Sequence, residues 1–217
     1  MTYRYLLFYK PYNVLSQFTD TGSAARSIDV QKNSSGAKSS RGTLKDFIDV
    51  PGVYAVGRLD RDSEGLLLLT DDGAMQHRLS HPKFGHWRQY WAQVEHAAHS
   101  PPINDSLEQL RNGVTIRGYR TRQAQARQIE PPALAPRNPP IRYRKQVPTV
   151  WFDLMLSEGK NRQVRRMTAA VGFPTLRLVR SAIFLSKDLN SPPLSIAGLQ
   201  PGQWRDLSAS EMRLLPR

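Results

Sequence analysis

The sequence predicts an α+β fold with a mixed, mostly antiparallel sheet and flanking helices. Strand-like segments outnumber helix-like segments, and the two kinds do not alternate regularly along the chain. Regular alternation is what a doubly wound sheet of parallel strands and crossover helices would require. A chain of 217 residues can bury a substantial core. We therefore expect a single domain over residues 1–217.

Alternating apolar and polar residues, bounded by turn residues, predict the strands. The predicted strands are residues 4–9, 13–18, 53–57, 65–70, 88–95, a pair within 114–130, 149–157 and 175–184. Segment 65–70 contains four consecutive leucines, which indicates a strand buried on both faces. In segment 88–95, alternation places Tyr90 on one face and Trp91 on the other.

Capping residues and helical spacing predict the helices. The predicted helices are a short one after Thr43, one after Asp72, residues 105–111, residues 160–171 and a terminal one after Ser208. Thr43 with Asp46, and Ser208 with Glu211, resemble capping boxes, in which side chains and backbone N–H groups of the first turn pair reciprocally.

Two long segments have the composition of basic loops. Residues 20–42 are dominated by Ser, Gly and Ala with scattered Lys and Arg, and they contain few apolar anchors. Residues 131–148 combine many prolines with several basic side chains. Such compositions cannot bury enough apolar surface to order a chain by themselves. We expect 20–42 to be a flexible basic loop and 131–148 to be a proline-rich basic loop.

The charge balance favours an anionic polymer as partner. Lys and Arg number 31 against 18 Asp and Glu, so the formal net charge is +13. Cations in such excess bind polyphosphates by releasing counterions, although a basic protein without a nucleic-acid partner is an alternative. The chain has no cysteine, which excludes disulfides and thiolate chemistry. No signal peptide or membrane-spanning segment is predicted, and we expect a cytoplasmic location.

Asp60 is the first candidate catalytic residue. It lies between Arg58 and Arg61, just before the leucine-rich strand, so that a rigid element would hold it. If residues 57–60 are extended, Arg58 and Asp60 project to the same side, and the guanidinium favours the ionised carboxylate. A reactive carboxylate in a basic chain suggests a nucleic-acid substrate. The alternative is a surface ion pair at the end of a strand.

The neighbouring acidic residues do not have the spacing of metal ligands. No histidine lies close to Asp62 or Glu64, and no EF-hand loop is present. Asp71 and Asp72 are better placed to cap a helix. The chain also lacks a phosphate-binding loop, a dinucleotide fingerprint and a nucleophile elbow. We predict no metal and no cofactor.

Two further segments have the residue types that bind RNA. In the predicted helix 160–171, Arg162, Arg165 and Arg166 share one stripe, and the first turn after Gly159 could bind phosphate. A solvated helix face is the alternative. Tyr90 lies among aromatic and basic residues, which can stack on splayed bases, or which can simply pack in a strand.

Several motifs in order along the chain resemble one known family. They are Lys10-Pro11-Tyr12 with Val14-Leu15-Ser16, Gly57-Arg58-Leu59-Asp60, Ser63 to Thr70, Glu158 to Met167, and Leu199 to Leu207. Together they are similar to the bacterial rRNA pseudouridine synthases of the RsuA-like group over nearly the whole chain. The resemblance implies the pseudouridine synthase catalytic fold, in which two abutting subdomains flank a central RNA-binding cleft.

The resemblance also implies an activity and roles for individual residues. A uridine in RNA would be isomerised to pseudouridine without a cofactor. Asp60 would be the essential carboxylate, which either attacks the sugar or acts on a sugar intermediate. Tyr90 would stack on the target base, Arg165 would pair with Asp60, and Arg58 would fill the gap left by the flipped nucleotide.

Other expectations concern substrate and organisation. Lys160 and Arg162 are expected to bind substrate, and Arg162 occupies a position where histidine is common in the family. Members often begin with a small S4-type RNA-binding domain, which is expected to be absent here. The partner would be 23S rRNA or a large-subunit assembly intermediate, contacted by both basic loops, and the protein would be a monomer. A catalytically inactive RNA-binding or ribosome-assembly factor, or a synthase that acts on tRNA, is the alternative.

Overall fold

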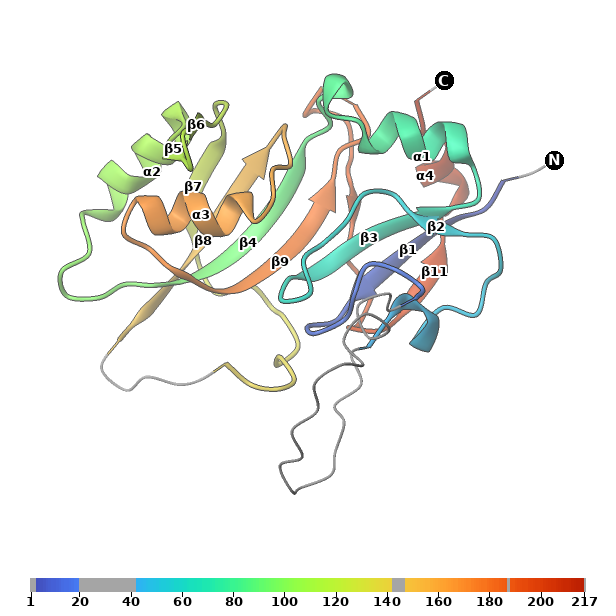
Figure 1. Cartoon of the computed structure of the whole chain (residues 1–217), viewed down its shortest axis with the longest axis horizontal. Coiled ribbons are helices and arrows are strands. Elements are labelled where there is room, and N and C mark those ends of the chain that lie inside the picture. Colours follow the sequence, from blue (N-terminus) through green and yellow to red (C-terminus); the bar gives the residue numbers. More distant parts are fainter. Residues whose placement is uncertain (1–2, 20–41, 142–146, 187, 217) are drawn as a thin grey trace, which may run out of the picture.

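The computed structural model describes residues 3–19, 42–141, 147–186 and 188–216 (Figure 1). Its strands are β1 (Tyr5–Lys10), β2 (Tyr54–Ala55), β3 (Glu64–Thr70), β4 (Arg88–Glu95), β5 (Thr115–Ile116), β6 (Tyr119–Arg120), β7 (Gln125–Ile129), β8 (Thr149–Leu156), β9 (Thr175–Ile183), β10 (Leu194–Ser195) and β11 (Trp204–Asp206). Its helices are α1 (Gly73–Ser80), α2 (Ile103–Asn112), α3 (Gln163–Ala170) and α4 (Ala209–Met212), with short 3-10 turns η2 (Leu44–Asp46) and η3 (Pro82–Phe84).

One mixed sheet runs through the described part of the chain. Its main order is β11-β1-β3-β9-β4-β8-β7, with β2 beside β3 and β10 beside β9. The pair β3–β9 is parallel, and the other strand pairs of the described residues are antiparallel. This arrangement confirms the predicted α+β class.

The leucine-rich strand β3 is the centre of one half of the sheet. All seven of its residues are buried. Leu66 and Leu68 pack with the core on one face, and Leu67 and Leu69 pack with a second cluster on the other face. The prediction of a strand buried on both faces is therefore confirmed, and the loop that carries Asp60 leads directly into this rigid element.

The other half of the sheet is covered on one face by two helices. Leucines of α2 and apolar residues of α3 pack on β4, β7 and β8, and Figure 1 shows both helices on the same side. Ala92 and Val94 are buried in this core and Tyr90 packs against it, whereas Trp91 packs against the opposite cluster. The predicted alternation along β4 is confirmed.

The two halves meet where β3 and β9 run side by side. Gly65 is paired there with Arg180, and its φ of 106° lies in a region that L side chains rarely adopt. A Cβ on Gly65 would lie 2.3 Å from the carbonyl oxygen of Arg180. Next to this contact, Arg177 donates hydrogen bonds of 2.9 and 2.8 Å to the buried carboxylate of Glu64. A glycine and a buried ion pair thus join the two halves.

Some predicted elements differ in the structure. Segment 13–18 is not a strand, because its hydrogen bonds are divided between the loop around Asp60 and residues 42–44. The helix predicted at 160–171 begins only at Gln163, since Arg162 has a left-handed backbone with φ of 52°. The short strands β10 and β11 have no alternation long enough to predict. Most of the predicted loop 20–42 and residues 142–146 of the proline-rich loop lie outside the described residues.

The helix starts predicted at Thr43, Asp72 and Ser208 agree with the structure. Asp72 caps α1 by accepting a 2.9 Å hydrogen bond from Met75 N, and both capping boxes form, at Thr43 with Asp46 and at Ser208. In the described part of the chain, no helix has the length and apolar character needed to cross a membrane.

Candidate active site

Asp60 lies in the loop between β2 and β3, and segment 13–16 binds this loop on both sides of Asp60. The hydroxyl of Ser16 accepts a 3.0 Å hydrogen bond from Leu59 N and donates one of 2.9 Å to Leu59 O. Asn13 N donates a 2.8 Å hydrogen bond to Arg61 O. Because the residues before and after it are held, the backbone of Asp60 has little freedom to move.

Lys10 contacts the same loop from the buried side. Its fully buried ammonium group lies 2.8 Å from the carbonyl oxygens of Pro11 and Val14 and 3.5 Å from that of Arg61. Burial lowers the pKa of Lys10 to about 7, although the neighbouring carboxylate of Glu64 opposes the shift. The ammonium group of Lys10, whose pKa lies near neutrality, is therefore in contact with the backbone of the candidate catalytic loop.

Asp62 binds Arg162 and Arg165, two of the predicted substrate-binding residues. Arg162 donates two hydrogen bonds of 2.8 Å to its carboxylate, and Arg165 Nε lies 3.4 Å from it. Arg165 Nη2 also donates a 2.6 Å hydrogen bond to Asp62 O. Burial alone would raise the pKa of Asp62, but the hydrogen bonds from Arg162 and the charge of Arg165 outweigh it and lower this pKa.

This geometry corrects one expectation. Arg165 was expected to pair with Asp60, but among the described residues its ion pair is with Asp62, whose backbone oxygen it also binds. Arg165 therefore holds the backbone that follows Asp60, and its positive charge also lies close enough to interact with the carboxylate of Asp60.

Tyr90 projects from the middle of β4 toward the same region. Across the sheet it is paired with Arg180 of β9. The guanidinium of Arg180 is buried, and its Nε donates a 2.7 Å hydrogen bond to Leu66 O. Burial lowers the pKa of Arg180, and the adjacent Tyr90 hydroxyl partly opposes this shift. Tyr90 thus has a buried cation beside its phenol group.

A cavity of about 550 Å³ connects these elements. Its walls include five of the six predicted site residues, which are Arg58, Asp60, Tyr90, Lys160 and Arg162. Leu156 and Leu178 contribute apolar surface, so the cavity combines a carboxylate, an aromatic ring, apolar walls and several cations. It has room for a nucleoside. The sixth predicted residue, Arg165, is not among the residues that line it.

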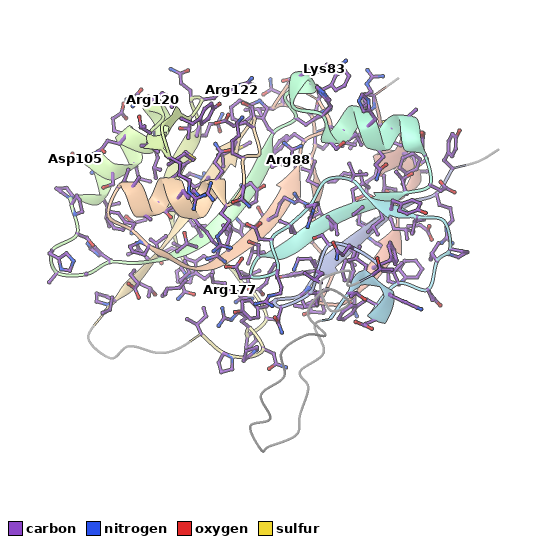
Figure 2. All side chains as sticks on the ribbon, in the orientation of Figure 1. Lys83, Arg88, Asp105, Arg120, Arg122 and Arg177 are labelled. Atoms are coloured by element: carbon purple, nitrogen blue, oxygen red, sulfur yellow. The ribbon has the colours of Figure 1, made fainter. Side chains whose placement is uncertain are left out.

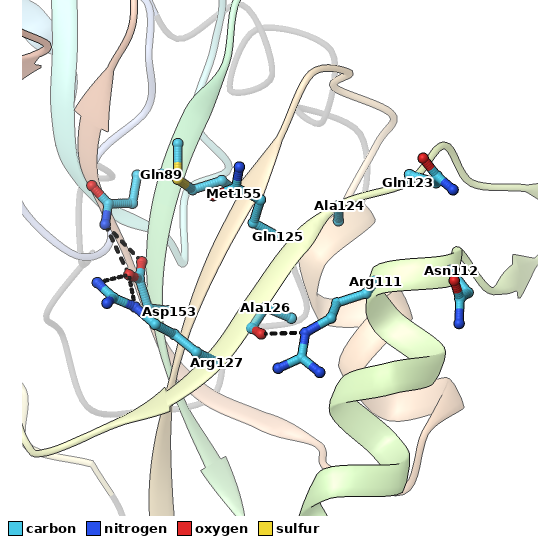
Figure 3. A pocket seen from close by; sticks show the side chains of 10 residues that line it. All are labelled: Gln89, Arg111, Asn112, Gln123, Ala124, Gln125, Ala126, Arg127, Asp153 and Met155. Carbon is cyan, nitrogen blue, oxygen red and sulfur yellow. Dashed lines mark hydrogen bonds and ion pairs between the residues drawn. The ribbon is translucent and has the colours of Figure 1, made fainter. Parts of the chain in front are cut away.

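A second cavity, of about 570 Å³, lies on the other face of β4 and β8 (Figure 3). Asp153 is the carboxylate on its wall, and it accepts hydrogen bonds from Gln89 at 2.8 and 3.0 Å and from Arg127 at 3.0 and 2.8 Å. All of these interactions are drawn in Figure 3. A carboxylate so fully bonded is a structural group, and we assign the reactive site to the cavity that contains Asp60.

The structure adds residues to which the sequence reasoning gave no role. Lys10 and Ser16 belong to one of the motifs that resemble the family, and no local pattern indicates that they bind the loop of Asp60. Arg180 had a detectable signal, since an arginine within a mostly apolar strand must find partners when it is buried. Within the described residues, no three His, Asp or Glu side chains gather as a metal site would require.

Comparisons with known proteins identify the family of this chain. Residues 4–170 match the family model described as RNA pseudouridylate synthase. The protein called ribosomal large subunit pseudouridine synthase E of Xanthomonas campestris pv. campestris is 47% identical over 209 residues, which cover 96% of this chain and 97% of that protein. The protein of the same description from Vibrio vulnificus is 45% identical over 203 residues, covering 94% of this chain and 74% of that protein.

One solved structure shares the fold. It is described as a pseudouridylate synthase, superposes with a TM-score of 0.67, and is 24% identical to this chain. The match covers 99% of this chain and 74% of the other. The likeness extends across both halves of the sheet.

Proposed function

The chain belongs to the RNA pseudouridylate synthase family, and we propose that it isomerises a specific uridine of large-subunit (23S) rRNA to pseudouridine with Asp60 as the essential carboxylate. Relatives that cover most of the chain are described as large-subunit rRNA pseudouridine synthases. The observation that supports the role of Asp60 is its place in a cavity whose walls also present Tyr90 and several cations.

The reaction requires a uridine to leave the RNA stack and enter the cavity. Flipping a nucleotide costs a few kcal/mol of unstacking free energy, which contacts to the flipped base and its backbone must offset. Tyr90 and the apolar walls formed by Leu156 and Leu178 are suited to bind the base. Arg58 is exposed at the rim, where its side chain can occupy the space that the nucleotide leaves.

Asp60 acts on the sugar in this proposal. The bond between C1′ and N1 breaks, the base turns while it remains bound, and a bond forms between C1′ and C5. The proton on C5 then leaves, and N1 gains a proton, so the product is an isomer of the substrate. Asp60 either attacks the sugar or acts on a sugar intermediate. Tyr90 lies on the wall of the same cavity, close to where the C5 proton must be removed.

The cations around the cavity are suited to hold the phosphate backbone. Arg58, Arg61 and Lys160 are exposed, and all three line the cavity. Arg162 binds Asp62 and keeps part of its guanidinium at the surface. We expect the protein to bind rRNA as a monomer, since the large apolar side chains exposed in the described residues are three separate tyrosines, Tyr3, Tyr54 and Tyr119.

The test uses unmodified transcripts of 23S rRNA, 16S rRNA and a pool of tRNAs. We expect the purified protein to form pseudouridine at one position of the 23S transcript and at none in the other two. Modification of tRNA instead would contradict the substrate assignment. Tight binding to rRNA without any pseudouridine, in naked transcripts and in large-subunit assembly intermediates alike, would indicate an RNA-binding factor.

A further inference from the structure

A short arginine-rich hairpin lies beside the proposed active site and has no role in the chemistry described above. Strands β5 and β6 pair through Thr115 with Arg120 and Ile116 with Tyr119. Residues 115–122 contain three arginines and no acidic residue. Arg117, Arg120 and Arg122 are exposed, and none of them forms an ion pair with a carboxylate of the described residues.

The hairpin is held rigidly against the wall of the cavity. The buried carboxylate of Glu158 accepts hydrogen bonds of 2.6 Å from Tyr119 Oη, 2.9 Å from Arg122 N and 2.6 Å from Gln163 Nε2. Lys160 Nζ, on the rim of the cavity, lies 4.7 Å from the centre of the Tyr119 ring. The three arginines therefore extend the positive rim of the cavity outward, and Figure 2 shows Arg120 and Arg122 along one edge of the molecule.

The tip of the hairpin has a residue that the backbone does not favour. Arg117 and Gly118 have φ of 48° and 74°, as in a type I′ turn, where Asn-Gly is the preferred pair. An arginine at the first position makes the turn less stable than asparagine would. Residues held in unfavourable backbone conformations are often retained for function, and here Arg117 presents at the exposed tip a guanidinium that has no carboxylate partner among the described residues.

We propose that this hairpin (residues 115–122) is a second RNA-binding element, in which Arg117, Arg120 and Arg122 bind the phosphate backbone of the substrate strand outside the cavity. The inference rests on the proposed function, because it takes RNA as the substrate. Guanidinium groups bind phosphate through paired N–H donors, and each contact releases counterions. Two acids lie nearby: Glu108 is already bound by Arg111 and Asn112, and the buried carboxylate of Glu158 is occupied by Tyr119, Arg122 N and Gln163.

The binding test compares two variants that remove the same charge. One is Arg120→Ala with Arg122→Ala, and the control is Arg4→Ala with Arg213→Ala at the end of the molecule where both termini lie, away from the hairpin (Figure 1). We expect the hairpin variant to bind 23S transcript roughly 10- to 100-fold more weakly, with a log–log salt slope shallower by about 1.5. The control should keep the wild-type slope. If the hairpin variant and the control variant bind the 23S transcript with equal affinity and equal salt slope, the proposal is overturned.

A third variant separates RNA binding from folding. Arg117→Asn restores the preferred turn residue, so we expect its Tm to rise by about 1–3 °C while its RNA affinity falls. A rise in Tm with unchanged affinity would overturn the role of Arg117. If the wild-type protein forms no pseudouridine, the proposed function fails, and the binding comparison still decides the role of the hairpin.

Discussion

Within the described residues, Asp60 is positioned by hydrogen bonds to the main chain around it rather than by a hydrogen-bond partner of its own side chain. Ser16 holds Leu59 by two hydrogen bonds, Asn13 holds Arg61, and Arg165 holds the backbone oxygen of Asp62. Each of these groups binds the main chain within two residues of Asp60. At the scale of single residues, these hydrogen bonds fix the backbone around Asp60 and leave its carboxylate available to a substrate.

Ser16→Ala tests this network. The change leaves Leu59 N and O without their partner, and we expect it to lower the free energy of unfolding by about 1–3 kcal/mol. Because the carboxylate would then be less well placed, kcat should fall roughly 10- to 100-fold with little change in KM. The stability control is Ser63→Ala, since the hydroxyl of Ser63 is buried without a hydrogen-bond partner in the described residues. Equal stability loss in the two variants would contradict the assignment.

Lys10 makes stability depend on pH in a predictable direction. Burial lowers its pKa to about 7, so between pH 7 and its ordinary value near 10.5 the unfolded chain binds a proton that the folded chain does not. Stability should therefore rise with pH in this window, by up to about 1.4 kcal/mol per pH unit from this one group. Urea unfolding between pH 7 and 9.5 measures the slope. Lys10→Met should remove this contribution, and an unchanged slope in that variant would contradict it.

At the scale of elements, the parallel contact between β3 and β9 determines how the two halves of the sheet meet. Gly65→Ala would bring a Cβ to 2.3 Å from the carbonyl oxygen of Arg180, at a backbone φ of 106°. We expect this variant to lose at least about 3 kcal/mol of stability or to fail to fold. Gly73→Ala is the matched control, because no atom lies within 4 Å of its added Cβ. Similar melting temperatures for the two variants would contradict the role of Gly65.

Long periodic elements could be predicted from the sequence, and contacts between distant segments could not. Strand β4 was predicted with its observed bounds, and the leucines of β3 correctly indicated burial on both faces. Segment 13–18 has the residue pattern of a strand, but its hydrogen bonds are divided between the loop of Asp60 and residues 42–44. No local pattern encodes that choice, because it depends on tertiary packing.

In the candidate site as well, local motifs could be predicted from the sequence, and contacts between distant segments could not. The motifs and the family resemblance brought Asp60, Tyr90 and the basic turn at 158–163 together, and the structure places them on one cavity. The expected partner of Arg165 was Asp60, whereas the described residues pair it with Asp62, a contact between distant segments that no local pattern predicts. The buried Arg180 was missed, since its position beside Tyr90 results from the pairing of β4 with β9.

At the scale of the whole molecule, the net charge of +13 should determine how the protein approaches RNA. We propose that both basic loops, 20–42 and 131–148, bind phosphate together with the cavity rim. Changing Lys32, Lys38 and Arg41 together to Ala should weaken rRNA binding and make its salt dependence shallower. Filter binding of 23S transcript at several salt concentrations measures both quantities. Unaltered affinity and slope would show that the first of these loops does not bind RNA.

The most direct test of the account concerns Asp60 itself. Wild-type protein, Asp60→Asn and Asp153→Asn, which alters the carboxylate of the other cavity, are each incubated with unmodified 23S transcript, and pseudouridine is counted over time. We predict that the wild type and Asp153→Asn form pseudouridine at the same position, whereas Asp60→Asn binds the RNA with unchanged affinity and forms none. Equal rates for the wild type and Asp60→Asn would contradict the central claim that Asp60 is the catalytic carboxylate.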